Sequence, residues 1–161
     1  MELTSLFKRQ KELDDYIEQK HDLTSRDLFE EKILALFVEI GELANETRCF
    51  KFWSVKEPSP KEVILEEYVD GIHFLLSLGL TRGLTPAQAE PFEQETTTTS
   101  LFNQMYRAID YFKDQQDEET YLIVFELYLK LARQLGFTDD DILTAYHEKN
   151  DVNFKRQDSN Y

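Results

Sequence analysis

Residues Asp27–Cys49 read DLFEEKILALFVEIGELANETRC, and this stretch decides the fold. Its apolar residues recur at intervals of three and four over several turns, which predicts an amphipathic helix. They are Leu28, Ile33, Leu36, Phe37, Ile40, Leu43 and Ala44. Glu39 and Glu42 lie three residues apart, on one face of this helix, and Glu39 falls within or at the edge of the apolar stripe. The stretch therefore predicts a helix that carries carboxylates beside a buried face.

A second acidic pair, Glu67 and Asp70, repeats this spacing in the next predicted helix, Lys61–Leu80. That helix is apolar almost all round, which indicates a central position. The preceding tetrapeptide Ser59-Pro60-Lys61-Glu62 predicts its start, with a serine cap, a proline at the first position and a glutamate that completes a capping box.

The rest of the chain also favours helices, because glycine and proline are few. The predicted helices are Leu3–Gln19, Leu101–Asp114, Glu118–Leu135 and Asp139–Lys149, the last capped by Thr138. Thr81–Ser100 is predicted to be a long, partly flexible connection, and Asn150–Tyr161 is a polar tail. The sequence predicts a single all-α domain over residues 1–161, with about six helices in a bundle.

The composition narrows the possible partners. With 18 Lys and Arg against 32 Asp and Glu, the formal charge is −14, which argues against nucleic acid or an anionic membrane surface. No apolar run reaches the roughly 20 residues that span a bilayer. The single cysteine, Cys49, excludes an internal disulfide and a cysteine-rich metal site. We expect a soluble protein of a reducing compartment. Because the protein is acidic, it would bind an anionic ligand only if metal cations lay between the two.

The two acidic pairs need an explanation if they face the core. An unpaired buried carboxylate costs several kcal/mol or takes up a proton, and carboxylates from adjacent helices repel one another. Divalent cations resolve the conflict, and an all-oxygen ligand set suits Mg²⁺ or Mn²⁺. Gly41 and Gly71 lie inside the acidic segments and would allow close backbone approach. The alternative is ordinary surface acids on a non-enzymatic helical module that binds a basic partner.

A family resemblance rests on these residues together with FKFW at 50–53, DGIHF at 70–74 and KNDVNFKRQ at 149–157. The chain resembles, over nearly its whole length, the dimeric all-α dUTP diphosphatases of bacteria and their phages. These belong to the all-α nucleoside triphosphate pyrophosphohydrolase superfamily, which includes the MazG-like enzymes. The resemblance implies a cytoplasmic homodimer that hydrolyses dUTP, and generally dUDP, to dUMP. A diphosphatase for another nucleotide, such as dCTP or a damaged one, is the nearest alternative.

By this resemblance the Mg²⁺ ligands are Glu39, Glu42, Glu67 and Asp70. The bound ions would neutralise the carboxylates, hold phosphate oxygens and activate a water that attacks the α-phosphorus, with pyrophosphate leaving. One carboxylate orients that water or accepts its proton. Glu39 is our preferred candidate because it has apolar neighbours, and Glu42 is its rival.

The resemblance also assigns the nucleoside contacts. Trp53 would stack on uracil, or else serve as a core or interface anchor. His73 would contact deoxyribose or base with Phe74 packed beside it, although a histidine on an apolar helix is also typical of a core. Gln10 and Asp14 resemble the uracil-reading pair, where relatives commonly have Asn at the second position; Gln10 could instead be an exposed helix residue.

The tail supplies the last group of predicted contacts. Lys149, Asn153 and Arg156 resemble the phosphate-binding motif of the family, and arginine can hold phosphate with two hydrogen bonds. We expect this segment to order on nucleotide binding. The alternative is a solvated, frayed terminus.

Overall fold

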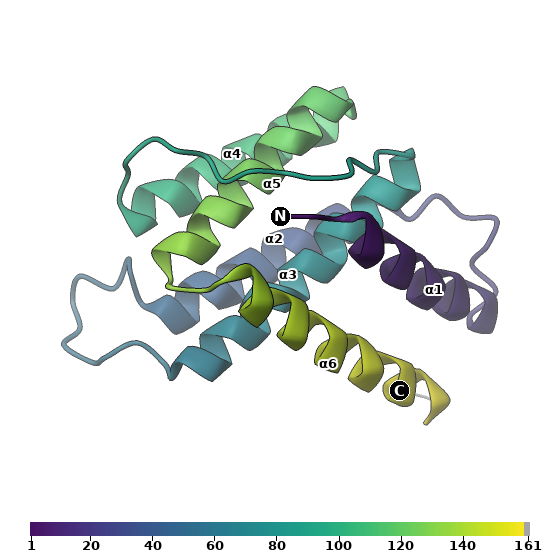
Figure 1. Ribbon diagram of the computed structural model, residues 1–161, viewed down its shortest axis with the longest axis horizontal. Helices are drawn as coiled ribbons and strands as arrows, with labels where there is room; N and C mark the ends of the chain where they lie inside the picture. The colour runs from purple at the N-terminus through teal and green to yellow at the C-terminus, as the bar shows by residue number, and fades with distance from the viewer. Residues whose placement is uncertain (160–161) are drawn as a thin grey trace.

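The computed structural model describes residues 1–159, which fold into six α-helices (Figure 1). They are α1 (Thr4–Lys20), α2 (Phe29–Thr47), α3 (Lys61–Arg82), α4 (Thr98–Gln115), α5 (Glu118–Gln134) and α6 (Asp139–Asp158). Within the described residues, β pairing is limited to an isolated bridge between Glu2 and Gln88. The predicted all-α class and the number of helices are confirmed.

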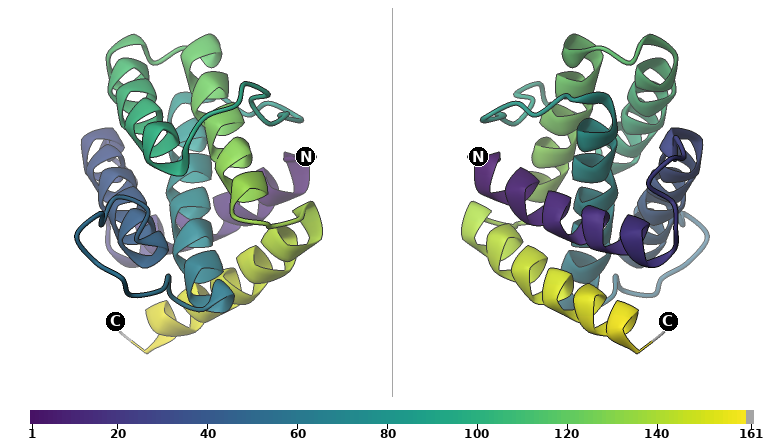
Figure 2. Two further views of the ribbon diagram at one scale, coloured as in Figure 1. Left: turned by 90° about the vertical axis from the view of Figure 1, so that its left-hand side faces the viewer. Right: turned by 90° about the vertical axis from the view of Figure 1, so that its right-hand side faces the viewer.

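Helix α3 runs through the middle of the molecule, as its apolar circumference predicts. It contacts α1, α2, α5 and α6, and α1 and α6 lie side by side across it (Figure 2). Its side chains at Tyr68, Ile72, Leu75 and Leu76 are at most 1% exposed, so they are surrounded by neighbouring helices. Any polar side chain on α3 is therefore held within a packed frame.

The contact between α3 and α5 depends on a glycine. Tyr68 and Tyr128 each donate a hydroxyl hydrogen bond of 3.1 Å to the other's backbone oxygen, and their rings lie 4.7 Å apart. A Cβ atom on Gly71 would overlap the Tyr128 hydroxyl. The predicted close approach at Gly71 is thus explained by a buried tyrosine pair.

Of the two N-terminal helix caps predicted from the sequence, the one at α6 forms and the one at α3 does not. Helix α6 begins at the predicted cap, where Thr138 and Asp141 form a capping box. Helix α3 begins after Pro60 without a side-chain cap, so the predicted capping box is wrong. The Ser59 hydroxyl instead donates a hydrogen bond to the carboxylate of Glu46, which joins this loop to the end of α2.

The long connection of residues 83–97 is tied to the body of the protein by backbone hydrogen bonds. Leu3 N donates to Ala87 O at 2.8 Å, Ala89 N donates to Met1 O at 3.1 Å, and Phe92 N donates to Glu126 O at 3.0 Å. The connection is shorter than predicted, because Thr98 already lies in α4. At the other end of the chain, α6 extends nine residues past the predicted end at Lys149, and residues 160 and 161 of the predicted tail lie outside the described residues.

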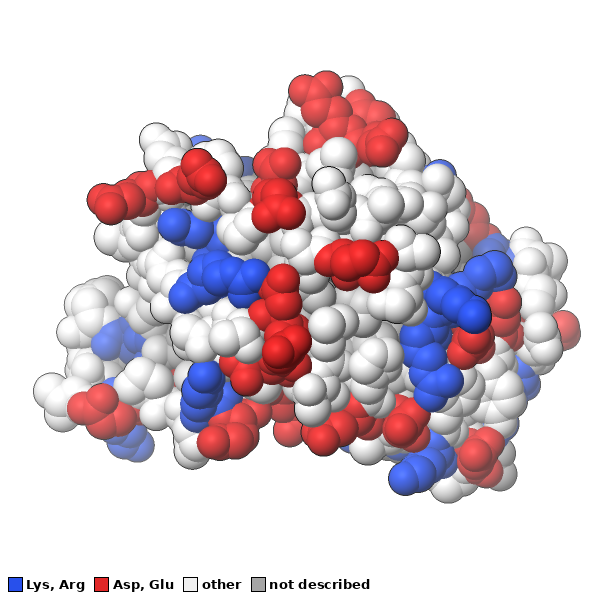
Figure 3. Space-filling view, in the orientation of Figure 1, with Lys and Arg blue, Asp and Glu red and all other residues white. Residues whose placement is uncertain are grey.

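Charged side chains of both signs are interspersed on the surface shown in Figure 3, with acidic groups prominent. None of the helices of residues 1–159 has the length and hydropathy needed to cross a bilayer.

Candidate active site

Three carboxylates from two helices converge at the surface between α2 and α3. Glu39 comes from α2, and Glu67 and Asp70 come from α3. Each offers an oxygen, and these oxygens all lie within 4.8 Å of one another. The predicted juxtaposition of the two acidic helices is therefore present, and we refer to these residues as the three-carboxylate cluster.

Glu42, the fourth predicted ligand, is exposed and lies outside this cluster. It is close enough that its charge raises the pKa of both Glu39 and Glu67. The structure thus brings together three of the four predicted ligands and places the fourth at the rim.

Burial and mutual repulsion both disfavour ionisation of the three-carboxylate cluster. Burial, followed by the charges of Asp70, Glu42 and Glu67, raises the pKa of Glu39 from 4.5 to about 7. Burial is also the main cause of the raised pKa values of Glu67 and Asp70. Two unit charges about 5 Å apart repel by about 3 kcal/mol at an effective dielectric constant of about 20. Half-buried carboxylate oxygens at this separation fit a divalent cation of the Mg²⁺ or Mn²⁺ type.

Lys149 of α6 supplies positive charge to one side of the cluster. Its ammonium group donates hydrogen bonds to Asp70 Oδ2 at 2.7 Å and to Glu66 Oε1 at 2.9 Å. Only 11% of its side chain is exposed. A residue predicted to bind phosphate therefore lies directly beside a predicted metal ligand. Glu66 was missed, since the sequence spacing drew attention only to Glu67 and Asp70.

A buried polar network lies one turn further along α3. His73 Nδ1 and Gln10 Oε1 are 2.8 Å apart, and the Tyr146 hydroxyl donates to the same Gln10 oxygen at 2.9 Å. The rings of His73 and Tyr146 stack with centroids 4.4 Å apart. Gln10 is only 3% exposed, so its interpretation as an exposed helix residue is wrong. The network joins α1, α3 and α6.

Asp14 extends this network along α1. The Gln10 amide nitrogen donates to Asp14 Oδ1 at 2.7 Å, and the Ser77 hydroxyl donates to Asp14 Oδ2. Lys32 Nζ lies 3.7 Å from the same Oδ2 atom. The predicted pair of Gln10 and Asp14 is thus hydrogen-bonded, and Ser77 and Lys32 are its unpredicted partners.

The aromatic residues of the predicted site are in different environments. Phe74 is partly buried and packs against the core, next to His73 in α3. Trp53 is 65% exposed in the loop between α2 and α3, and its ring meets Phe50 and Phe52 edge-on. Among the described residues, no ring contact joins Trp53 to His73 or Phe74. The structure excludes a core role for Trp53.

The end of α6 carries the remaining predicted contacts. Asn153 is half-buried, and Arg156 is exposed but close enough to lower the pKa of Glu66 and Asp70 through its charge. Asn150 was missed: it is fully buried, and neither polar atom of its side chain makes a regular hydrogen bond to another described residue. Its spacing of four residues from Tyr146 could have placed it on the buried face of α6.

Comparison with known protein families gives a match over nearly the whole chain. A family model described as dUTPase matches residues 2–161. The comparison with curated proteins finds no match.

Proposed function

Since the chain belongs to the dimeric, all-α dUTPase family and is therefore a dUTP diphosphatase, we propose that it hydrolyses dUTP to dUMP and pyrophosphate with Mg²⁺ at the three-carboxylate cluster. The convergence of Glu39, Glu67 and Asp70 carries this proposal. In the proposed site Glu67, Asp70 and Glu39 hold the metal, and Glu42 joins them from the rim. Mg²⁺, when bound, offsets the carboxylate charges and those of the phosphate oxygens.

Glu39 is the residue best suited to accept the proton of the attacking water. Its carboxylate is half-buried, and burial with the neighbouring carboxylates raises its pKa in the metal-free protein. A bound Mg²⁺ would lower that pKa and keep Glu39 ionised, which is the form that accepts a hydrogen bond or a proton from water. Its position in α2, facing Glu67 and Asp70, would let it orient the water toward the α-phosphorus. Bond formation to that phosphorus releases pyrophosphate. The exposed carboxylate of Glu42 is the second candidate.

Residues of α6 are placed to bind the phosphates. Lys149 lies at the edge of the cluster, where its ammonium group could exchange the Asp70 carboxylate for a phosphate oxygen. Asn153 and Arg156 follow on the same helix, one and two turns further on. An arginine and a lysine together suit the charge of a triphosphate.

The nucleoside would extend from the cluster along α3. His73 lies one turn beyond Asp70, and it is linked to Gln10 and Asp14. Phe74 offers apolar surface beside it. Trp53, exposed on its loop, would stack on the base when the loop folds over the site.

We also expect a homodimer. Helix α2 leaves Leu34 and Val38 exposed at 64% and 49%, and Tyr111 on α4 is 56% exposed. Apolar side chains gathered on neighbouring helices are typical of a self-association surface. Light scattering coupled to size-exclusion chromatography would test this expectation.

Product analysis with dUTP and Mg²⁺ tests the proposal. We expect dUMP and pyrophosphate, no turnover after chelation, and loss of activity in Asp70→Asn. Asp110→Asn, which removes an exposed carboxylate of α4, is the matched control and should retain activity. Preference for dCTP or a damaged nucleotide would favour the other diphosphatase function. Full activity of Asp70→Asn would contradict the site.

A further inference from the structure

In the buried network around Gln10, Asp14 determines which groups donate hydrogen bonds and which accept them. An ionised carboxylate only accepts hydrogen bonds, and three donors face this one: the Gln10 amide nitrogen, the Ser77 hydroxyl and the Lys32 ammonium group. The Gln10 amide must therefore turn its NH₂ group toward Asp14. Its oxygen is left facing Tyr146 and His73.

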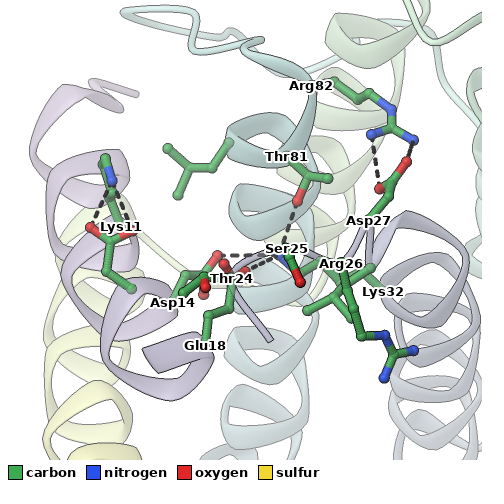
Figure 4. A pocket seen from close by; sticks show the side chains of 13 residues that line it. Lys11, Asp14, Glu18, Thr24, Ser25, Arg26, Asp27, Lys32, Thr81 and Arg82 are labelled. Atoms are coloured by element: carbon green, nitrogen blue, oxygen red, sulfur yellow. Dashed lines mark hydrogen bonds and ion pairs between the residues drawn. The ribbon is translucent and has the colours of Figure 1, made fainter. Parts of the chain in front are cut away.

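Lys32 is itself held firmly in this arrangement. Its ammonium group donates to Thr81 Oγ1 at 2.9 Å and to Glu18 Oε1 at 3.4 Å. The side chains of Lys32 and Asp14 are each only 14% exposed. The pair forms part of the wall of a pocket of about 460 Å³ between α1, α2 and the end of α3, where Figure 4 shows Lys32 between Asp14 and Thr81. Burial raises the pKa of Asp14, and the Lys32 charge and the hydrogen bonds from Ser77 and Gln10 oppose that shift by favouring the carboxylate form.

The Gln10 oxygen then dictates which nitrogen of His73 is protonated. An amide oxygen accepts hydrogen bonds and cannot donate them, so His73 Nδ1 must carry the proton at its 2.8 Å contact. Burial lowers the pKa of His73 to about 3, so the ring is neutral and its other nitrogen is unprotonated. That atom, Nε2, is buried and has no hydrogen-bond partner among the described residues.

We propose that Asp14 is a positioning residue: it fixes the Gln10 amide, which holds His73 as the Nδ1-protonated tautomer and leaves Nε2 as the acceptor for a hydrogen-bond donor of the nucleotide. This inference rests on the proposed function only for its last step. The donor is an O–H of deoxyribose or the N–H of uracil. Nε2 is covered by protein in the nucleotide-free structure, so the proposed contact requires the surrounding side chains to move when the nucleotide binds.

The side chain at position 14 determines whether the Gln10 amide turns its NH₂ group or its oxygen toward His73. An asparagine can donate as well as accept, so Asp14→Asn permits the reversed network, in which Gln10 turns its oxygen toward position 14 and its NH₂ toward His73. His73 Nδ1 would then accept, and the proton would move to Nε2. The substitution keeps the size of the side chain.

Nitrogen-15 NMR of the histidine rings tests the proposal in the nucleotide-free protein. We expect the Nδ1-protonated pattern for His73 in the wild type and gain of the Nε2-protonated form in Asp14→Asn. Asp15→Asn, which removes the adjacent exposed carboxylate paired with Lys11, should leave the His73 signals unchanged. An Nε2-protonated wild type, or an Asp14→Asn variant with the wild-type pattern, would overturn the role of Asp14. Neither result depends on dUTP hydrolysis.

Addition of dUMP tests the last step. We expect the His73 Nε2 signal to shift as it accepts a hydrogen bond. Loss of this shift with 3′-deoxy-dUMP would identify the sugar hydroxyl as the donor, and loss with N3-methyl-dUMP would identify the base. No shift with dUMP, under conditions where tryptophan fluorescence or calorimetry shows binding, would overturn the assigned contact.

Discussion

Lys149 of α6 donates a 2.7 Å hydrogen bond to Asp70 of α3, although the two residues lie 79 positions apart in the sequence. This contact joins the predicted phosphate-binding helix to the three-carboxylate cluster. It places an ammonium group where it partly offsets the carboxylate charges, and it would compete with a metal ion for Asp70. Phosphate binding and metal binding should therefore be coupled through Lys149.

Replacement of Lys149 separates these two effects. Lys149→Met removes a positive charge beside the cluster, so Mg²⁺ binding to the nucleotide-free protein should become about tenfold tighter. The KM for dUTP should nevertheless rise, because a phosphate contact is lost. Calorimetry and steady-state kinetics measure the two quantities. Lys155→Met, at an exposed position further along α6, should change neither, and weaker Mg²⁺ binding in Lys149→Met would contradict the coupling.

Glu39 should make stability depend on pH in the absence of metal. Its pKa is about 7 in the folded protein against 4.5 in an ordinary glutamate, so between these values the folded state holds a proton that the unfolded chain has lost. The free energy of unfolding should decrease as pH rises through this interval. Above pH 7, Glu39→Gln should stabilise the metal-free protein by about 1–2 kcal/mol, a value reduced for solvent screening of this half-buried group.

Denaturant unfolding at pH 4 and pH 8 with chelator measures this difference. At pH 4 Glu39 is protonated in the folded state and mostly protonated in the unfolded chain, so the variant and the wild type should differ little. Asp110→Asn, which removes an exposed acid of α4 and keeps Glu39, is the control and should match the wild type at both pH values. Equal stability of Glu39→Gln and wild type at pH 8 would show that the cluster does not destabilise the metal-free fold.

Trp53 should report nucleotide binding because it is the single tryptophan and is 65% exposed. We expect dUMP to quench its fluorescence, and Trp53→Leu to raise the KM for dUTP about tenfold, within the range of aromatic–base stacking. The free energy of unfolding should change by less than about 0.5 kcal/mol, since the side chain is not in the core. Phe52→Leu, at a neighbouring residue that is 94% exposed, should retain the wild-type KM. Unchanged fluorescence and KM would remove Trp53 from the site.

The packing of α3 on α5 should depend on the fit of Gly71 against Tyr128. Gly71→Ala gains about 1 kcal/mol of helix propensity, but its Cβ overlaps the hydroxyl of Tyr128, whose side chain is fully buried and bonded to Tyr68. We expect a net loss of about 1–3 kcal/mol in the free energy of unfolding. Tyr128→Phe removes the hydroxyl and should recover at least half of that loss, which a double-mutant cycle measures. Additive effects of the two substitutions would contradict direct contact.

The periodic parts of the sequence allowed good prediction of the fold. All six helices follow from apolar spacing, and Thr138 with Asp141 caps α6 as its local sequence suggests. Ser59 could equally cap α3 or bond elsewhere, and the nearby carboxylate of Glu46 decided the outcome. The polar end of α6 looked unlike a helix because it has few apolar residues. Two residues of α1 contact this end of α6: the Tyr16 hydroxyl donates to Asp158, and Arg9 donates to Asp151. Helix α1 therefore supports the end of α6 through polar contacts that apolar spacing does not reveal.

The candidate site was predictable only in part. The spacing of the acidic pairs placed carboxylates on one face of each helix, but the relative rotation of α2 and α3 decided that Glu39 enters the cluster and Glu42 stays at the rim. Long-range partners such as Lys149 with Asp70 and Lys32 with Asp14 depend on tertiary packing. No local pattern in the sequence specifies them.

A crystal structure with Mn²⁺ and a non-hydrolysable dUTP analogue tests the central claim most directly. The account predicts anomalous density between the carboxylates of Glu39, Glu67 and Asp70, with the α-phosphate of the analogue beside it. Manganese bound elsewhere, with these three carboxylates uncoordinated in the presence of the analogue, would contradict the proposed metal-dependent site.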